Sequence, residues 1–154
     1  MQAGAIRPIV LCLFRHENHI LVSSHYDTVK QEWFCRPVGG GIEFGEQSRS
    51  AMRREIQEEL GVPIDHLALL GVLESLFTYE GRPGHEIVFV YDATFVDRAL
   101  YQQTTVHGWE QGITMAFTAT WKSVEELRQG AVRLVPDGLL DLLHKLAPPQ
   151  ESPS

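Results

Sequence analysis

The chain has few cysteines, little positive charge and no long apolar run, and each shortage excludes a class of protein. Its two cysteines, Cys12 and Cys35, show no zinc-ligand spacing, so we expect a buried small residue and a loop or strand residue rather than a disulfide or metal site. The formal net charge of -7 opposes non-specific binding to long nucleic acid, which requires clustered lysine and arginine. Neither a disulfide scaffold nor a nucleic-acid-binding protein is expected.

No apolar stretch approaches the roughly 20 residues that a membrane span requires. The segment from Met1 to Pro8 lacks the charged and apolar blocks of a signal peptide. These features predict a cytoplasmic protein without membrane association. The 154 residues, 44% of them hydrophobic, suit one domain over residues 1–147, followed by a flexible Pro- and Ser-rich tail over residues 148–154.

Apolar runs and turn-forming clusters alternate along the chain, which is typical of an α/β or α+β fold with mixed strands. Strands are expected at Ile6 to Phe14, His19 to Tyr26, Trp33 to Val38, Leu67 to Tyr79, His85 to Val96 and Ala116 to Trp121. The first two strands are expected to form a hairpin, and a turn at residues 80–84 to connect a second hairpin. Helices are expected at Gln47 to Leu60, at Val124 to Gln129 with Ser123 as N-cap, and at Pro136 to Leu146 with Pro136 near its first turn.

The first expected helix carries an apolar stripe beside an acidic cluster. The apolar positions recur every fourth residue, at Met52, Ile56 and Leu60, and Gly61 follows as a stop. The acidic positions at i, i+3 and i+4 share one arc of the helix: Glu55, Glu58 and Glu59. Like charges at this spacing repel one another, so a hard divalent cation bound among them would explain the cluster. A solvated acidic face is the alternative interpretation.

Three glycines, Gly39 to Gly41, precede this helix. Because they lack a Cβ, they are expected to let the backbone turn sharply and approach a ligand closely. Together with Glu46 and the run from Arg54 to Val62, Gly40 completes the pattern G-x5-E-x7-R-E-U-x-E-E-x-G-U, where U is aliphatic. This is the Nudix box, so the chain resembles a Nudix hydrolase from about Ala5 to Leu146.

The resemblance implies a Nudix fold, in which mixed β-sheets are sandwiched between α-helices. It also implies Mg²⁺- or Mn²⁺-dependent hydrolysis of a phosphoanhydride bond in a nucleoside diphosphate linked to another moiety. The residues that match the family's metal ligands are Glu58 and Glu59, with the backbone carbonyl of Gly39 as a further ligand. Glu55 either joins them or helps to activate water, and the general base stays open.

Three box residues are expected to support the site: Gly40, Glu46 and Arg54. Arg54 either clamps a phosphate or pairs with carboxylates and orients the glutamates, and the resemblance favours the second role. A further ligand or base in this family commonly lies downstream of the box, and Glu110 is the candidate here, with a solvated loop acid as the alternative.

The substrate is much less well defined than the reaction. The signatures of NADH and coenzyme A hydrolases are not visible, and Thr78 stands where ADP-ribose hydrolases often have proline. Tyr79, 17 residues past Val62, slightly favours dinucleoside polyphosphates, with nucleotide sugars and oxidised nucleoside triphosphates as further options. Tyr79 and Glu86 are the candidate substrate-binding residues, although each also suits an ordinary strand position.

Two other functions fit the same fold, because fold does not determine function. One is a catalytically silent Nudix-fold protein that binds a nucleotide and regulates a partner, and the complete acidic triad opposes it. The other is a diphosphate-ester isomerase. The expected partner is a small nucleotide substrate, and a homodimer is one expected assembly state.

Overall fold

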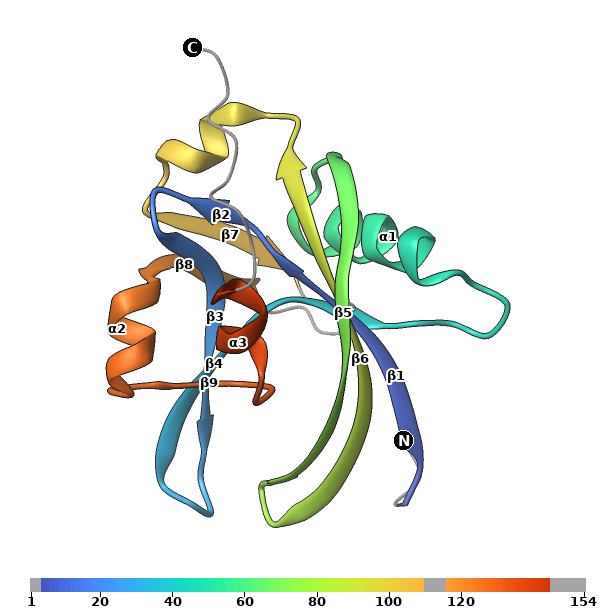
Figure 1. The fold of residues 1–154 in the computed structure, drawn as a ribbon, viewed down its shortest axis with the longest axis vertical. Helices are drawn as coiled ribbons and strands as arrows, with labels where there is room; N and C mark the ends of the chain where they lie inside the picture. The colour runs from blue at the N-terminus through green and yellow to red at the C-terminus, as the bar shows by residue number, and fades with distance from the viewer. Residues whose placement is uncertain (1–3, 110–115, 145–154) are drawn as a thin grey trace.

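The computed structural model describes residues 4–109 and 116–144, which form a nine-stranded mixed sheet with helices on both faces (Figure 1). The strands lie in the order β5-β6-β1-β4-β3-β8-β7, with β2 paired to β3 and β9 paired to β4. Their bounds are β1 Ile6–Leu13, β2 Arg15–His16, β3 His19–Asp27, β4 Glu32–Gly41, β5 Ile64–Tyr79, β6 Arg82–Phe95, β7 Thr105–Trp109, β8 Ala116–Ser123 and β9 Arg133–Leu134. The helices are α1 Ser48–Leu60, α2 Val124–Gln129, α3 Leu139–His144 and the short 3₁₀ helix η1 Arg98–Gln102. This mixed α+β architecture agrees with the fold class expected from the sequence.

Strand β1 is buried on both faces because it lies in the interior of the sheet, between β6 and β4. Successive side chains of a strand point to opposite faces. Val10 and Cys12 therefore pack in the core beneath α1, whereas Ile9 and Leu11 pack in the core beneath α2 and α3. The nearly continuous apolar run in the sequence thus reflects a strand between two cores.

Strand β4 changes its pairing partner along its length and carries all three glycines in extended backbone. Its first part pairs with β3, and its last residues, from Val38 to Gly41, pair with β1. None of Gly39, Gly40 or Gly41 has a positive φ, so the expected sharp turn is wrong. The glycines instead permit close approach: a Cβ on Gly39 would overlap the backbone carbonyl of Val10.

Helix α1 forms as the sequence predicts, because its apolar period matches the helical repeat. Met52 and Ile56 are fully buried and Leu60 packs against the same core. The helix ends at Gly61, which has a φ of 71° and donates its N–H to the Gln57 carbonyl at 2.9 Å.

The predicted hairpin of β5 and β6 is confirmed, and it turns through Glu80 and Gly81, both of which have positive φ. Figure 1 shows that this hairpin and the β3–β4 hairpin extend toward the same end of the molecule. Hydrogen bonds join the tips of the two hairpins to each other. The Thr28 N–H donates to Glu80 Oε1 at 3.0 Å, and the Glu80 N–H donates to Asp27 Oδ2 at 3.3 Å. Asp27 is 2% exposed, and its other oxygen, Oδ1, accepts from the Val29 and Lys30 N–H groups at 3.0 Å, so backbone hydrogen bonds satisfy this buried carboxylate.

Two further expectations require correction. The strand at the N-terminus does not form a hairpin with β3; only the short β2 does so, and β1 pairs with β4 and β6 instead. The last helix begins at Leu139, so Pro136 precedes it rather than lying in its first turn. By contrast, α2 has the predicted bounds, and the Ser123 side chain caps it by accepting from the Glu126 N–H.

Several features lay outside the predicted strands and helices. Strand β7 occupies a segment expected to be a loop, and η1 was not expected.

Both cysteines are buried and free. No helix in the described part of the chain is long and apolar enough to cross a membrane. Residues 148–154, expected to be a tail, lie outside the described residues.

Candidate active site

Arg54 lies at the centre of the box residues. Its Nε and Nη2 donate to the two carboxylate oxygens of Glu46, each at 2.8 Å. Its Nη1 donates to Glu55 Oε1 at 2.9 Å and to Glu58 Oε2 at 3.1 Å, while Nη2 also reaches the Gly41 carbonyl at 2.8 Å. A guanidinium suits this position because its planar fork binds several oxygens at once. One arginine therefore connects the helix, the strand end and the intervening loop.

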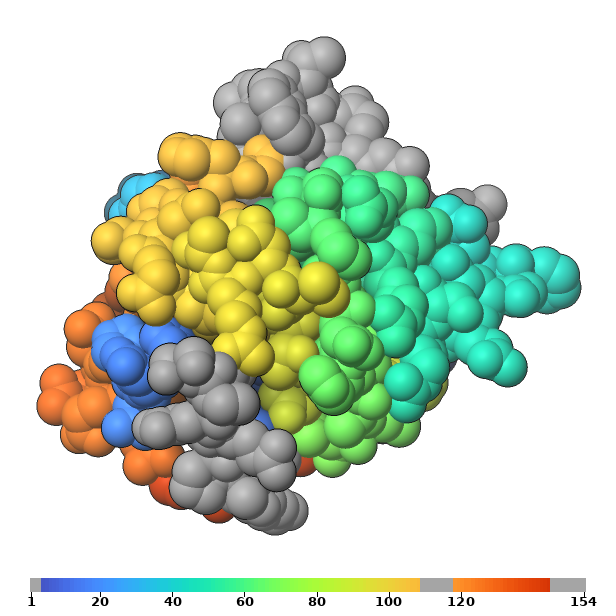
Figure 2. Space-filling view, turned by 90° about the horizontal axis from the view of Figure 1, so that it is seen from above, coloured from blue at the N-terminus to red at the C-terminus, as the bar shows by residue number. Residues whose placement is uncertain are grey.

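Glu46 fixes the loop between β4 and α1. This loop projects from the body of the molecule, where Figure 2 shows it in cyan, and Phe44 on it is fully exposed. Hydrogen bonds from Arg54, and then from the Glu43 N–H, lower the pKa of Glu46 from its usual 4.5 to about 2. The Glu46 carboxylate is therefore charged throughout the neutral range and connects the end of this protruding loop to α1 through Arg54.

Glu55 is the buried member of the acidic cluster, with 7% of its surface exposed. Its carboxylate lies directly against Gly40, where any Cβ would overlap it. Burial raises the pKa of Glu55, and the nearby charge of Glu58 adds to this effect, while Arg54 opposes both. The box glycine and the first box glutamate thus form one packing unit: the missing side chain makes room for the carboxylate.

Glu59 lies beside Glu55, with which its side chain interacts, and also borders a cavity. It lines a small cavity of about 30 Å³ together with Gly39 of β4. The other lining residues come from β3 and β4: Ser23, His25, Arg36, Pro37 and Val38. Two of the residues expected to bind metal, Glu59 and Gly39, therefore line the same cavity.

The donor chemistry of this site fits a hard divalent cation. Among residues 4–109 and 116–144, no three histidine, cysteine, aspartate or glutamate side chains are already gathered as a set of metal ligands. However, Glu55 and Glu58 converge on a single nitrogen of Arg54, and Glu59 shares its cavity with Gly39. All these donors are oxygens, which Mg²⁺ and Mn²⁺ prefer.

The structure separates the two expected substrate-binding residues. Glu86, on β6, forms an ion pair with Arg7 at 3.7 Å, and a Cβ on Gly41 would lie 3.1 Å from the same guanidinium. The Arg7 side chain thus lies between Glu86 and Gly41 at the end of β4. Tyr79 lies at the tip of the β5–β6 hairpin, with its ring centroid 5.5 Å from that of Phe34. Glu110 lies outside the described residues.

Sequence reasoning missed the strand residues that face Glu59. Ser23 is paired with Arg36 in the β3–β4 ladder, and His25 with Phe34. The available signal was weak: these polar residues interrupt two otherwise apolar or aromatic strands. Only the register of the two strands shows that they line the same cavity as the helix glutamate.

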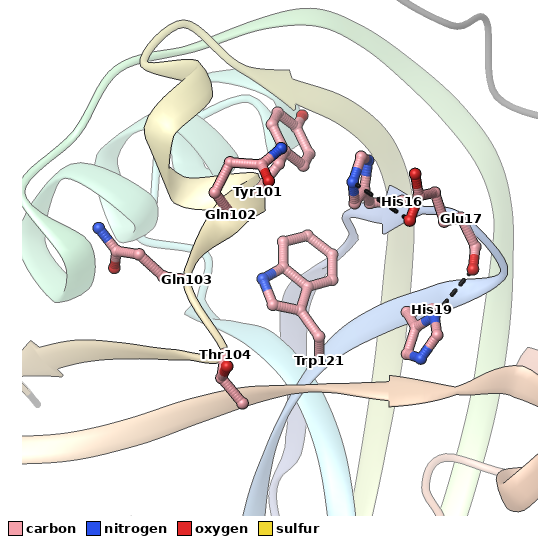
Figure 3. A pocket seen from close by; sticks show the side chains of 8 residues that line it. All are labelled: His16, Glu17, His19, Tyr101, Gln102, Gln103, Thr104 and Trp121. Carbon is pink, nitrogen blue, oxygen red and sulfur yellow. Dashed lines mark hydrogen bonds and ion pairs between the residues drawn. The ribbon is translucent and has the colours of Figure 1, made fainter.

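A larger cavity of about 290 Å³ is built from other segments (Figure 3). It is lined by the β2–β3 turn, η1 with the residues after it, and β8: His16, Glu17, His19, Tyr101, Gln102, Gln103, Thr104 and Trp121. The polar atoms of the Trp121 and Tyr101 rings form hydrogen bonds with the backbone of neighbouring segments. Trp121 Nε1 donates to the Leu100 carbonyl at 3.3 Å, and the Tyr101 hydroxyl accepts from the Phe95 N–H at 2.8 Å. These rings hold η1 against the sheet.

Comparisons with known proteins agree with the box and the fold. The family model of the NUDIX domain matches residues 5–142. The chain is structurally similar to a MutT NUDIX hydrolase from Burkholderia pseudomallei, at a TM-score of 0.64 and 19% identity over 93% of this chain and 100% of that one. It is also similar to a NUDIX hydrolase from Nitrosomonas europaea, at a TM-score of 0.56 and 18% identity over 91% and 87% of the two chains. An ADP compounds hydrolase gives a TM-score of 0.56 at 16% identity over 81% and 63%.

The chain belongs to the NUDIX domain family and is a hydrolase of phosphorus-containing acid anhydrides. The structural similarities, all below 25% identity, show a shared fold.

Proposed function

We propose that the protein is a divalent-metal-dependent pyrophosphohydrolase that acts on a nucleoside diphosphate linked to another moiety. The observation that carries this proposal is the grouping of Glu55 and Glu58 around Arg54, with Glu59 and Gly39 lining the same small cavity. This arrangement brings carboxylates of α1 close to the glycine-containing end of β4.

Mg²⁺ or Mn²⁺ would be held by Glu58, Glu59 and the Gly39 carbonyl, with Glu55 as a further ligand or as the group that accepts a proton from water. When bound, the cation neutralises charge on the phosphate oxygens during in-line displacement. Arg54 keeps Glu55 and Glu58 in fixed orientations, and Gly40 provides the space that the Glu55 carboxylate fills. Glu110 stays a candidate for the second acid or base.

The substrate is proposed from the classes that the sequence favours: a dinucleoside polyphosphate, a nucleotide sugar or an oxidised nucleoside triphosphate. Tyr79 supports an aromatic contact, since its ring packs on Phe34, which in turn stacks on His25 at the cavity wall. We also propose a cytoplasmic location, in keeping with a small nucleotide substrate.

The test is a hydrolysis panel with purified protein and Mg²⁺. It should contain dinucleoside polyphosphates, nucleotide sugars, NADH and oxidised and unmodified nucleoside triphosphates, with released phosphate and monophosphate as readouts. We expect turnover of at least one class that contains a diphosphate bond, and loss of turnover when the metal is chelated. Absence of hydrolysis across the panel, with nucleotide binding retained, would favour the silent nucleotide-binding alternative.

A further inference from the structure

Arg36 has a buried guanidinium nitrogen without a hydrogen-bond partner. Its Nε is inaccessible to solvent and makes no hydrogen bond within the described part of the chain. Among those residues, no carboxylate forms an ion pair with it either. Buried polar groups are almost always paired, and a buried donor on a charged group is especially costly to leave unsatisfied. The Arg36 side chain as a whole is only partly buried, so an anion that binds the solvent-facing end of the guanidinium would offset this unfavourable burial.

The neighbourhood of Arg36 is held in place by the fold. Arg36 is on β4, three residues before Gly39, and it lines the same cavity as Glu59. Across the β3–β4 ladder, the Ser23 hydroxyl is hydrogen-bonded to His25 Nε2 at 2.9 Å and donates to the Arg36 carbonyl at 3.4 Å. Arg36 therefore lies on a hydrogen-bonded strand pair and lines the same cavity as the proposed metal-binding residue Glu59.

The two arginines of the site differ in their available donors. The Arg54 guanidinium donates hydrogen bonds to Glu46, Glu55, Glu58 and the Gly41 carbonyl. The Arg36 guanidinium makes no hydrogen bond within the described part of the chain, and Arg36 lines the small cavity while remaining partly exposed. Guanidinium groups bind phosphate oxygens through parallel hydrogen bonds, and a substrate of the proposed reaction brings strong negative charge to this site. A phosphate clamp is thus chemically better suited to Arg36 than to Arg54.

We propose that Arg36 is a substrate-binding residue that donates to a phosphate group of the substrate, next to the reacting diphosphate. This inference rests on the proposed hydrolase function for the identity of the ligand. It adds a specific role for a strand residue outside the box. A second possibility, that Arg36 reads the oxygen of a nucleobase edge instead, is separated from the phosphate assignment by the experiment.

The experiment compares Arg36→Gln and Arg36→Lys with wild type and with a control, Arg49→Gln. Arg49 is an exposed residue of α1, so this control makes the same change in net charge on the helix that carries the glutamates. Dissociation constants are measured by calorimetry in Mg²⁺ for three probes: inorganic pyrophosphate, adenosine monophosphate and adenosine. The melting temperature of each variant establishes that it is folded. These measurements need no turnover.

We expect Arg36→Gln to weaken pyrophosphate and adenosine monophosphate binding by roughly 10- to 100-fold, the scale of losing a charged hydrogen bond. Arg36→Lys should retain part of the affinity, because it keeps the charge but loses the planar fork. Adenosine binding and the control variant should be unchanged. For any substrate found in the panel, Arg36→Gln should raise KM more than it lowers kcat.

The inference is wrong if Arg36→Gln binds both phosphate probes as tightly as wild type, or if wild type binds neither. It is also wrong if adenosine and adenosine monophosphate lose affinity equally, because that result would assign Arg36 to the nucleobase. Failure of the proposed function gives a different result. In that case no substrate is hydrolysed by wild type, while the phosphate probes still bind in an Arg36-dependent manner.

Discussion

The Glu55 carboxylate occupies the space that a side chain on Gly40 would require. Helix α1 and strand β4 can therefore approach each other closely only because one residue lacks a Cβ. Two positions 15 residues apart in the sequence are thereby coupled through packing. This relationship gives the spacing between the glycine and the first glutamate of the box a steric explanation that is independent of any bound cation.

Alanine at Gly40 should therefore disrupt the site more than the fold. The added Cβ overlaps the end of the Glu55 side chain, which can move aside, so we expect a large loss of activity with a modest change in melting temperature. Alanine at Gly39 meets the backbone carbonyl of Val10, which cannot move aside, and should cost about 1–3 kcal/mol of folding free energy or more. Thermal unfolding and kcat of both variants test the contrast. Equal destabilisation by the two substitutions would contradict this explanation.

Glu59→Gln should abolish most of the activity while leaving the fold intact. The substitution preserves size and removes the charge that faces the cavity shared with Gly39. We expect kcat to fall by about two orders of magnitude or more, the scale of losing a principal electrostatic contributor. Glu125→Gln, in the first turn of α2, is the matched control. An unchanged kcat for Glu59→Gln would remove Glu59 from the catalytic group.

Arg54→Ala should weaken several properties together, because one guanidinium connects the loop, the helix and the strand end. We expect a loss of about 1–3 kcal/mol in stability from the unpaired carboxylates, with lower Mn²⁺ affinity and lower activity. Calorimetry and thermal unfolding measure these effects, with Arg49→Ala as the control on the same helix. A rise in KM alone, with metal affinity and melting temperature unchanged, would indicate a phosphate clamp instead.

The interaction of Glu46 with Arg54 should depend on pH in a defined direction. In the folded protein the pKa of Glu46 is lowered from 4.5 to about 2, so the folded state favours the charged carboxylate. Its contribution to stability is complete above about pH 4.5 and is lost as the pH falls toward 2. The difference in melting temperature between wild type and Glu46→Gln should therefore shrink between pH 5 and pH 2. A difference that grows on acidification would contradict the assignment.

Glu110→Gln addresses the part of the reaction outside the box. If Glu110 supplies the second acid or base, the variant should have a lower rate at saturating substrate, while the glutamates of α1 still bind metal. Rates measured across the pH range, together with Mn²⁺ titration, separate these effects. Full activity at every pH would make Glu110 an ordinary surface acid and leave Glu55 as the candidate base.

The sequence by itself determined the features that depend on neighbours along the chain. Helix α1 follows from the spacing of Met52 and Ile56 and from the stop at Gly61, and α2 follows from its Ser123 cap. The β5–β6 hairpin follows from its turn residues. The box pattern likewise identified the acidic cluster, because its residues lie within two turns of one helix.

Only the tertiary structure decided which distant segments meet. The long N-terminal strand pairs with β4 and β6 rather than with its neighbour β3, because its two apolar faces must be covered by cores on both sides of the sheet. The strand register then places Arg36 and Ser23 beside Glu59, and the contact of α1 with β4 buries Glu55 against Gly40. These relationships arise from packing between distant segments, and the residue pattern of one segment does not determine which other segment it contacts.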